Sequence, residues 1–84
     1  MATYKDLKDK LVLYMGDEEL KLVHKAYLYA LKKHFGQKRL TGEEYITHPI
    51  EVALILANIK ADKETICAGI LHDVLKILKH QKKN

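Results

Sequence analysis

The chain has 84 residues, a formal net charge of +4 and one cysteine, Cys67. A chain of this length forms one small domain, here residues 1–84, and buries only roughly 60–65% of its unfolded surface. A single cysteine excludes an internal disulfide, so we expect Cys67 to be a small buried apolar residue in a reducing, cytoplasmic environment. The polar start of the sequence is unlike a signal peptide, and no run approaches the roughly 20 apolar residues of a membrane span.

The positive charge gathers near the end of the chain, at Lys76, Lys79, Lys82 and Lys83. No basic stripe with interleaved aromatic residues accompanies it, as it does in proteins that grip single-stranded nucleic acid. We therefore expect a solvated basic end and neither a nucleic-acid nor a membrane partner.

Apolar residues recur at spacings of three and four, which predicts an all-α fold. Thr3 is expected to cap a first helix that Gly16 ends, and Asp17 to cap a second helix that Gly36 ends. The first apolar face holds Tyr4, Leu7, Leu11 and Tyr14. The second holds Leu20, Val23, Tyr27, Ala30, Leu31 and His34.

Residues 36–45 break the helical pattern with two glycines and several polar side chains, so we expect a structured loop. Loops on a helical framework are where ligand contacts usually lie. Arg39 is the candidate contact, since a guanidinium can stack on a base or bind a phosphate with two hydrogen bonds. The alternative is a surface arginine paired with Glu43 or Glu44.

Pro49 suits the first turn of a third helix, which would make His48 the N-cap residue. The histidine could serve as a cap alone, or it could bind a ligand. The predicted buried face of this helix holds Val52, Ala53, Ile55, Leu56 and Ile59.

Asp62 is expected to cap a fourth helix that is apolar over most of its circumference. Three short helices cannot cover such a helix completely. Either a second copy of the chain covers the remainder, giving a homo-oligomer, or the helix is suited to segments that this sequence lacks. The apolar residues are Ile66, Ala68, Ile70, Leu71, Val74, Leu75, Ile77 and Leu78.

Within this apolar helix stands the polar pair His72 and Asp73, which needs a partner if it is buried. A metal ion would satisfy both side chains, and His48 could approach from the facing helix. Two imidazole nitrogens and one carboxylate oxygen suit Mn, Fe or Zn, and such an ion can activate water for hydrolysis. The alternative is a His-Asp pair satisfied by hydrogen bonds or solvent.

Two segments resemble the N-terminal hydrolase region of RelA/SpoT proteins: HFGQKRLTGEEYITHP at residues 34–49 and DKETICAGILHDV at residues 62–74. The resemblance implies an all-helical, HD-type bundle of four to five helices that lacks the C-terminal half of the intact hydrolase domain. Enzymes of this family use a divalent ion, typically manganese, to remove pyrophosphate from the 3′ position of the alarmones ppGpp and pppGpp. On this resemblance His48, His72 and Asp73 are metal ligands, and Arg39 contacts the guanosine nucleotide.

The sequence also departs from the family. An acidic pair that orients the attacking water is replaced by Lys76 and Ile77, and a lysine after the loop arginine is replaced by Leu40. The family's fourth metal ligand would lie beyond Asn84. We therefore expect a catalytically impaired relative that retains metal or nucleotide binding. The alternatives are a hydrolase completed by oligomerisation and a non-catalytic helical interaction module.

Overall fold

The computed structural model describes residues 2–82, and the side chains of residues 2–76. Its four helices are α1 (Tyr4–Leu11), α2 (Asp17–Lys33), α3 (Thr47–Asn58) and α4 (Lys63–Lys82). Among the described residues, the only β-type pairing is an isolated bridge between Lys38 and Glu44. The predicted all-α fold is confirmed. None of these helices, as far as they are described, is long and apolar enough to cross a membrane.

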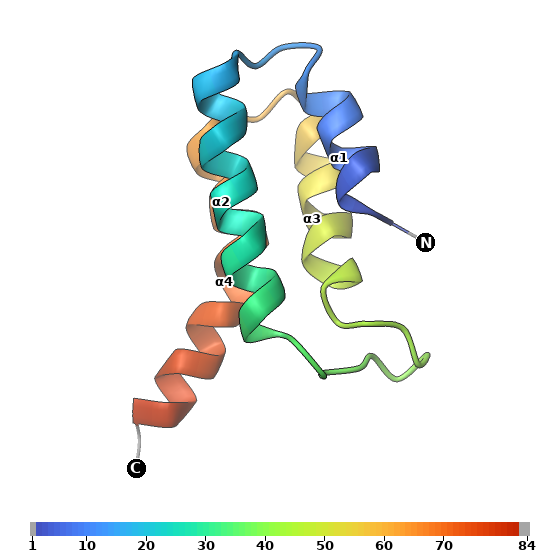
Figure 1. Cartoon of the computed structure of the whole chain (residues 1–84), viewed down its shortest axis with the longest axis vertical. Helices are drawn as coiled ribbons and strands as arrows, with labels where there is room; N and C mark the ends of the chain where they lie inside the picture. Colours follow the sequence, from blue (N-terminus) through green and yellow to red (C-terminus); the bar gives the residue numbers. More distant parts are fainter. Residues whose placement is uncertain (1, 83–84) are drawn as a thin grey trace.

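Helix α4 is the element against which the others are arranged. Both α2 and α3 pack against α4, while α1 packs mainly against α3 (Figure 1). The Tyr14 hydroxyl donates a 2.7 Å hydrogen bond to the Ala61 carbonyl, which joins the segment before α2 to the segment before α4. Helices α2 and α4 therefore start at the same end of the molecule and run in the same direction (Figure 1).

The core explains why α4 is so apolar. Three residues at intervals of four, Ile66, Ile70 and Val74, are at most 1% exposed. Together with apolar residues of the other helices they form one cluster. Removing this cluster from water is the main favourable contribution to folding. Leu75 lies outside this stripe and is exposed, so part of the apolar surface of α4 remains uncovered. Ile77 and Leu78 lie outside the residues whose side chains are described.

The first helix begins where the sequence predicts and ends earlier. Thr3 and Asp6 form a capping box, in which each side chain accepts a hydrogen bond from the other residue's backbone N–H. The helix ends at Leu11, well before Gly16. Tyr14 lies beyond the helix, in a turn whose backbone N–H groups at Tyr14 and Met15 donate to the Leu11 carbonyl, and its hydroxyl reaches Ala61.

The predicted cap of α2 is wrong by one residue. Gly16 is the N-cap and Asp17 the first helical residue, because the Glu19 carboxylate accepts a 3.1 Å hydrogen bond from the Gly16 backbone N–H. The helix ends at Lys33, and Gly36 follows in the loop with φ of +83°, a left-handed conformation that favours glycine. Leu31, predicted on the buried face, is exposed.

The predictions for α3 need two corrections. The N-cap residue is Ile46, so His48 lies within the first turn and does not cap the helix. The buried face is also rotated from the predicted one, because Ile55 and Ile59 are 67% and 75% exposed. Ala53 is buried as predicted, and the other buried residues of this helix are Thr47, Pro49, Ile50 and Ala57.

Close contact between α3 and α4 depends on Gly69. A Cβ atom on Gly69 would lie 2.8 Å from Leu56 Cδ1 and 3.4 Å from Val52 Cγ1, so a larger residue would have to displace these side chains. The start of α4 is as predicted, since Asp62 Oδ1 accepts a 2.9 Å hydrogen bond from the Thr65 backbone N–H. The two helices therefore face each other at short range over the turns that carry His48 and His72.

Candidate metal centre

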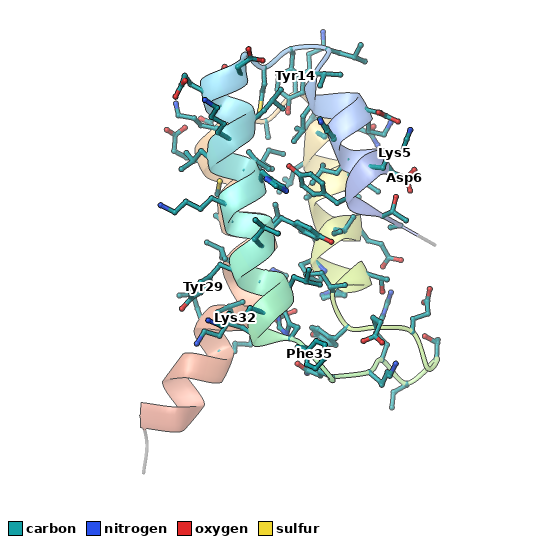
Figure 2. All side chains as sticks on the ribbon, in the orientation of Figure 1. Lys5, Asp6, Tyr14, Tyr29, Lys32 and Phe35 are labelled. Atoms are coloured by element: carbon teal, nitrogen blue, oxygen red, sulfur yellow. The ribbon has the colours of Figure 1, made fainter. Side chains whose placement is uncertain are left out.

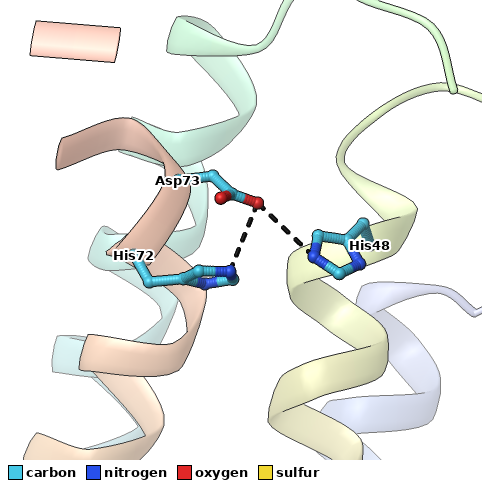
Figure 3. A group of neighbouring side chains, drawn as sticks. All are labelled: His48, His72 and Asp73. Carbon is cyan, nitrogen blue, oxygen red and sulfur yellow. Dashed lines mark ion pairs between the residues drawn. The ribbon is translucent and has the colours of Figure 1, made fainter. Parts of the chain in front are cut away.

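Three of the predicted site residues converge between α3 and α4. His48 projects from the first turn of α3, while His72 and Asp73 project from α4 toward it (Figure 3). One ligand atom from each residue lies within 4.8 Å of the other two. The two helices thus bring together residues that are 24 positions or more apart in the sequence.

The distance of each histidine nitrogen from Asp73 fits two ligands of one ion. His48 Nε2 lies 3.4 Å, and His72 Nε2 lies 3.3 Å, from the same oxygen, Asp73 Oδ2. Two ligands about 2.1 Å from one ion are about 3.0 Å apart at right angles and about 3.4 Å apart at the tetrahedral angle. The two nitrogens and one oxygen also form a donor set that transition metals accept.

A hydrogen bond within α4 fixes the orientation of the His72 ring. His72 Nδ1 lies 2.6 Å from the Gly69 carbonyl oxygen. Because a carbonyl oxygen can only accept, Nδ1 carries a proton, and Nε2 is the ring nitrogen that faces Asp73 and could bind an ion. Metal-binding histidines are commonly oriented in this way by a carbonyl or carboxylate on the far ring nitrogen.

The Asp73 carboxylate is nearly buried and is held by a tyrosine that the sequence reasoning did not single out. Its side chain is 10% exposed, and Tyr45 donates a 2.8 Å hydrogen bond to Oδ2. Burial raises the pKa of the Tyr45 hydroxyl, and the bond to Asp73 raises this pKa further, so the hydroxyl remains a donor. Its position in the sequence could have indicated this role, because Tyr45 precedes His48 by three residues at the start of a helix.

The ring of Tyr45 is fixed from the other side. It packs on the buried His34 ring, with centroids 4.8 Å apart, and meets the His48 ring edge-on at 5.7 Å. His34 is oriented by a 3.0 Å hydrogen bond between Nδ1 and the Gln37 side-chain oxygen. The loop and the end of α2 therefore support the hydroxyl that reaches Asp73.

The model of the HD domain family matches residues 26–84, a range that includes all three converging residues. This chain belongs to the HD domain family. HD domains bind metal ions, and His48, His72 and Asp73 are the group that could hold one. That these side chains do bind a metal stays a prediction, as does the identity of the ion.

Among curated proteins, this HD-domain chain is 44% identical over 75 residues to the bifunctional (p)ppGpp synthase/hydrolase SpoT of Escherichia coli K12. It is 47% identical over 62 residues to a GTP pyrophosphokinase of Myxococcus xanthus and 41% identical over 70 residues to the GTP pyrophosphokinase rsh of Brucella ovis. These matches cover 89%, 74% and 83% of the chain, but only 11%, 8% and 9% of the three relatives. The resemblance to RelA/SpoT proteins is confirmed over this short region.

Arg39 of the HD-domain loop is not free at the surface. Its Nη1 donates to Glu51 Oε1 at 3.0 Å and to Thr47 Oγ1 at 3.2 Å, and Glu43 lies 3.7 Å away. Of the two predicted partners of Arg39, Glu43 lies nearby, whereas Glu44 pairs with Lys38 at 2.6 Å. The sequence did not indicate Glu51 as a partner of Arg39. These contacts fasten the loop to the first two turns of α3, which also carry His48.

One departure from the family's sequence lies directly at the site. The Lys76 ammonium is 3.9 Å from Asp73 Oδ1, so a positive charge stands where the resemblance places an acidic residue. Ile77, at the second position of that acidic pair, lies outside the residues whose side chains are described. Leu40, which replaces the family's lysine, is fully exposed on the loop.

Proposed function

We propose that this HD domain binds a divalent metal ion through His48, His72 and Asp73, and that it is impaired as a hydrolase. The observation that supports metal binding is the approach of two Nε2 atoms to one carboxylate oxygen, at 3.4 and 3.3 Å. The donors alone suit Mn, Fe and Zn. The resemblance to RelA/SpoT enzymes favours manganese.

We further propose a guanosine polyphosphate as the ligand of this site. Relatives carry the names (p)ppGpp synthase/hydrolase and guanosine-3′,5′-bis(diphosphate) 3′-pyrophosphohydrolase. Arg39 is the candidate nucleotide contact. Its ion pair with Glu51 holds the guanidinium in place, and 27% of its side chain remains exposed to receive a base or a phosphate.

Charge and the small number of ligands near Asp73 both support hydrolytic impairment. A bound ion would polarise the substrate and lower the pKa of a water molecule. Among the residues whose side chains are described, three offer ligand atoms to one ion, and the Lys76 ammonium near Asp73 opposes a second positive charge. Weak retention of the ion and slow hydrolysis follow from this arrangement.

Titration of metal-free protein with Mn²⁺ tests the proposal. We expect measurable but weak binding by the wild-type chain. K76E should tighten binding on the order of tenfold, because it exchanges a repulsive charge for an attractive one. K10E makes the same change in net charge at an exposed position of α1 and should leave the affinity unchanged. Absence of Mn²⁺ binding by both the wild type and K76E would refute the metal site.

The hydrolytic impairment is tested separately. Wild-type protein saturated with Mn²⁺ is mixed with guanosine tetraphosphate, and release of pyrophosphate is followed over time. We expect release close to that of a protein-free control. Rapid release of pyrophosphate would refute the proposed hydrolytic impairment but not the proposed metal site.

A further inference from the structure

The backbone of Arg39 is held in a tight turn of the loop between α2 and α3. The loop leaves α2 near Phe35, extends past the side of α3 and turns back into that helix (Figure 2). Within it the Arg39 backbone N–H donates to the Glu43 carbonyl at 2.8 Å. The Arg39 carbonyl accepts from the Gly42 backbone N–H at 2.9 Å. The side chain of Arg39 therefore starts from a fixed point.

Two acceptors on successive turns of α3 position the far end of this side chain. Arg39 Nη1 donates to Glu51 Oε1 at 3.0 Å and to Thr47 Oγ1 at 3.2 Å. The Thr47 hydroxyl donates in turn to the Glu44 carbonyl at 2.9 Å, so an oxygen lone pair is left to face Arg39. With the described side chains, each contact of the guanidinium is made through Nη1. The N–H groups on Nη2 and Nε are left for a ligand.

Glu51 also connects Arg39 to the candidate metal centre. It lies three positions after His48 on α3, and residues at that spacing are neighbours on one face of a helix. The guanidinium is therefore held beside the helical turn that carries a proposed metal ligand. A nucleotide that reaches both the ion and Arg39 meets a guanidinium that is already ordered.

The Arg39–Glu51 pair is surrounded by negative charge and is partly exposed. Glu51 and Glu43 lie 3.0 and 3.7 Å from Nη1, so two carboxylates stand beside one guanidinium and by charge alone oppose an anionic ligand. The two side chains of the pair are 27% and 43% exposed, and ion pairs at such positions contribute little to folding stability. Positioning of the guanidinium is the contribution of Glu51 that remains.

We propose that Glu51 is a positioning residue for the nucleotide and that it acts through Arg39. This inference rests on the proposed binding of a guanosine polyphosphate. By holding Nη1, the carboxylate orders a long side chain in advance, so the nucleotide does not have to order it on binding. Thr47 supplies the second acceptor for the same nitrogen, one turn earlier on α3.

Titration of the chain with guanosine tetraphosphate in the presence of Mn²⁺ tests this role. E51A should raise the dissociation constant of the nucleotide roughly three- to tenfold, the cost of ordering one long side chain on binding. R39A should raise it further, because the contact itself is lost. The double variant R39A/E51A should bind no more weakly than R39A. E51Q keeps an oxygen that accepts from Nη1 and should lose less affinity than E51A.

E18A is the matched control, because it removes one carboxylate at an exposed position of α2 and should leave the affinity unchanged. Tighter nucleotide binding by E51A would show that Glu51 acts only through its charge. Equal effects of E51A and R39A would show that the pair only anchors the loop. Either result overturns the proposal.

The same titration distinguishes this inference from the proposed nucleotide ligand. If R39A weakens binding and E51A does not, the nucleotide site stands and the role of Glu51 is refuted. If the wild-type chain binds no guanosine tetraphosphate, the proposed ligand is refuted, and the role of Glu51 is refuted with it.

Discussion

A single carboxylate oxygen, Asp73 Oδ2, is the point on which the candidate site converges. It receives the Tyr45 hydroxyl at 2.8 Å and lies 3.4 and 3.3 Å from the Nε2 atoms of His48 and His72. The sequence indicated both histidines and the aspartate, because polar residues in apolar helices stand out. It did not indicate Tyr45, since an aromatic residue before a helix is usually explained by packing.

The first prediction concerns Tyr45. Y45F retains the ring that packs on His34 and removes only the hydroxyl that holds Asp73. Loss of such an orienting group typically lowers metal affinity by about 10- to 100-fold. We therefore expect Mn²⁺ binding to weaken by that order, with little change in thermal stability. The measurement is titration calorimetry of metal-free protein.

The control for this prediction is Y29F. Tyr29 is exposed on α2, and no described contact connects its hydroxyl to the candidate site. The affinity of Y29F for Mn²⁺ should equal that of the wild type. Equal affinities of Y45F and the wild type would show that Asp73 is positioned without help from Tyr45.

At the scale of the helices, local signals predicted the N-caps of α1 and α4, whereas tertiary contacts decided which way the helices face. The Thr3 and Asp62 caps act within three residues, so the sequence displays them directly. The exposure of Ile55 and Ile59 depends on how α3 meets Gly69 of α4, and no pattern within α3 contains that information.

The Asp62 cap predicts a dependence of stability on pH. Hydrogen bonds from the Thr65 hydroxyl and backbone N–H lower the pKa of Asp62 below the ordinary value of 3.8. The charged cap therefore stabilises the fold at neutral pH, and this contribution is lost as the pH falls below 3.8 through the lowered pKa. We expect D62A to lower the melting temperature by a few degrees at pH 7, and the difference from wild type to shrink in acid.

A second variant at position 62 distinguishes capping of α4 from ionisation of the capping side chain. Asparagine caps helices about as well as aspartate and does not ionise in this range. D62N should therefore keep the same advantage over D62A at pH 7 and in acid, when melting is followed by circular dichroism. An advantage of the wild type over D62A that stays constant from pH 7 to pH 2 would contradict the assigned pKa shift.

At the scale of the whole molecule, the sequence identified the family because two motif segments occur in the right order. It also predicted that α4 would be too apolar for its neighbours. It could not locate the uncovered surface, because a groove lined by Leu22 and Tyr29 of α2 and Leu71 of α4 forms only once the two helices pack together. The chain spans about 11% of the length of SpoT.

The last prediction links the candidate metal site to global stability. His48 lies on α3, and His72 and Asp73 lie on α4, so an ion held by all three would connect two helices of the core. Binding to the folded state alone adds about 2.7 kcal/mol when the ion is at 100 times its dissociation constant. For a domain of this size that corresponds to a rise in melting temperature of roughly 10–20 °C.

H48A should abolish the rise, whereas H24A, at an exposed position of α2, should retain it. Mg²⁺ should give a smaller shift than Mn²⁺, since it favours all-oxygen ligands over imidazole. An equal shift in wild type and H48A would place the bound ion elsewhere on the molecule.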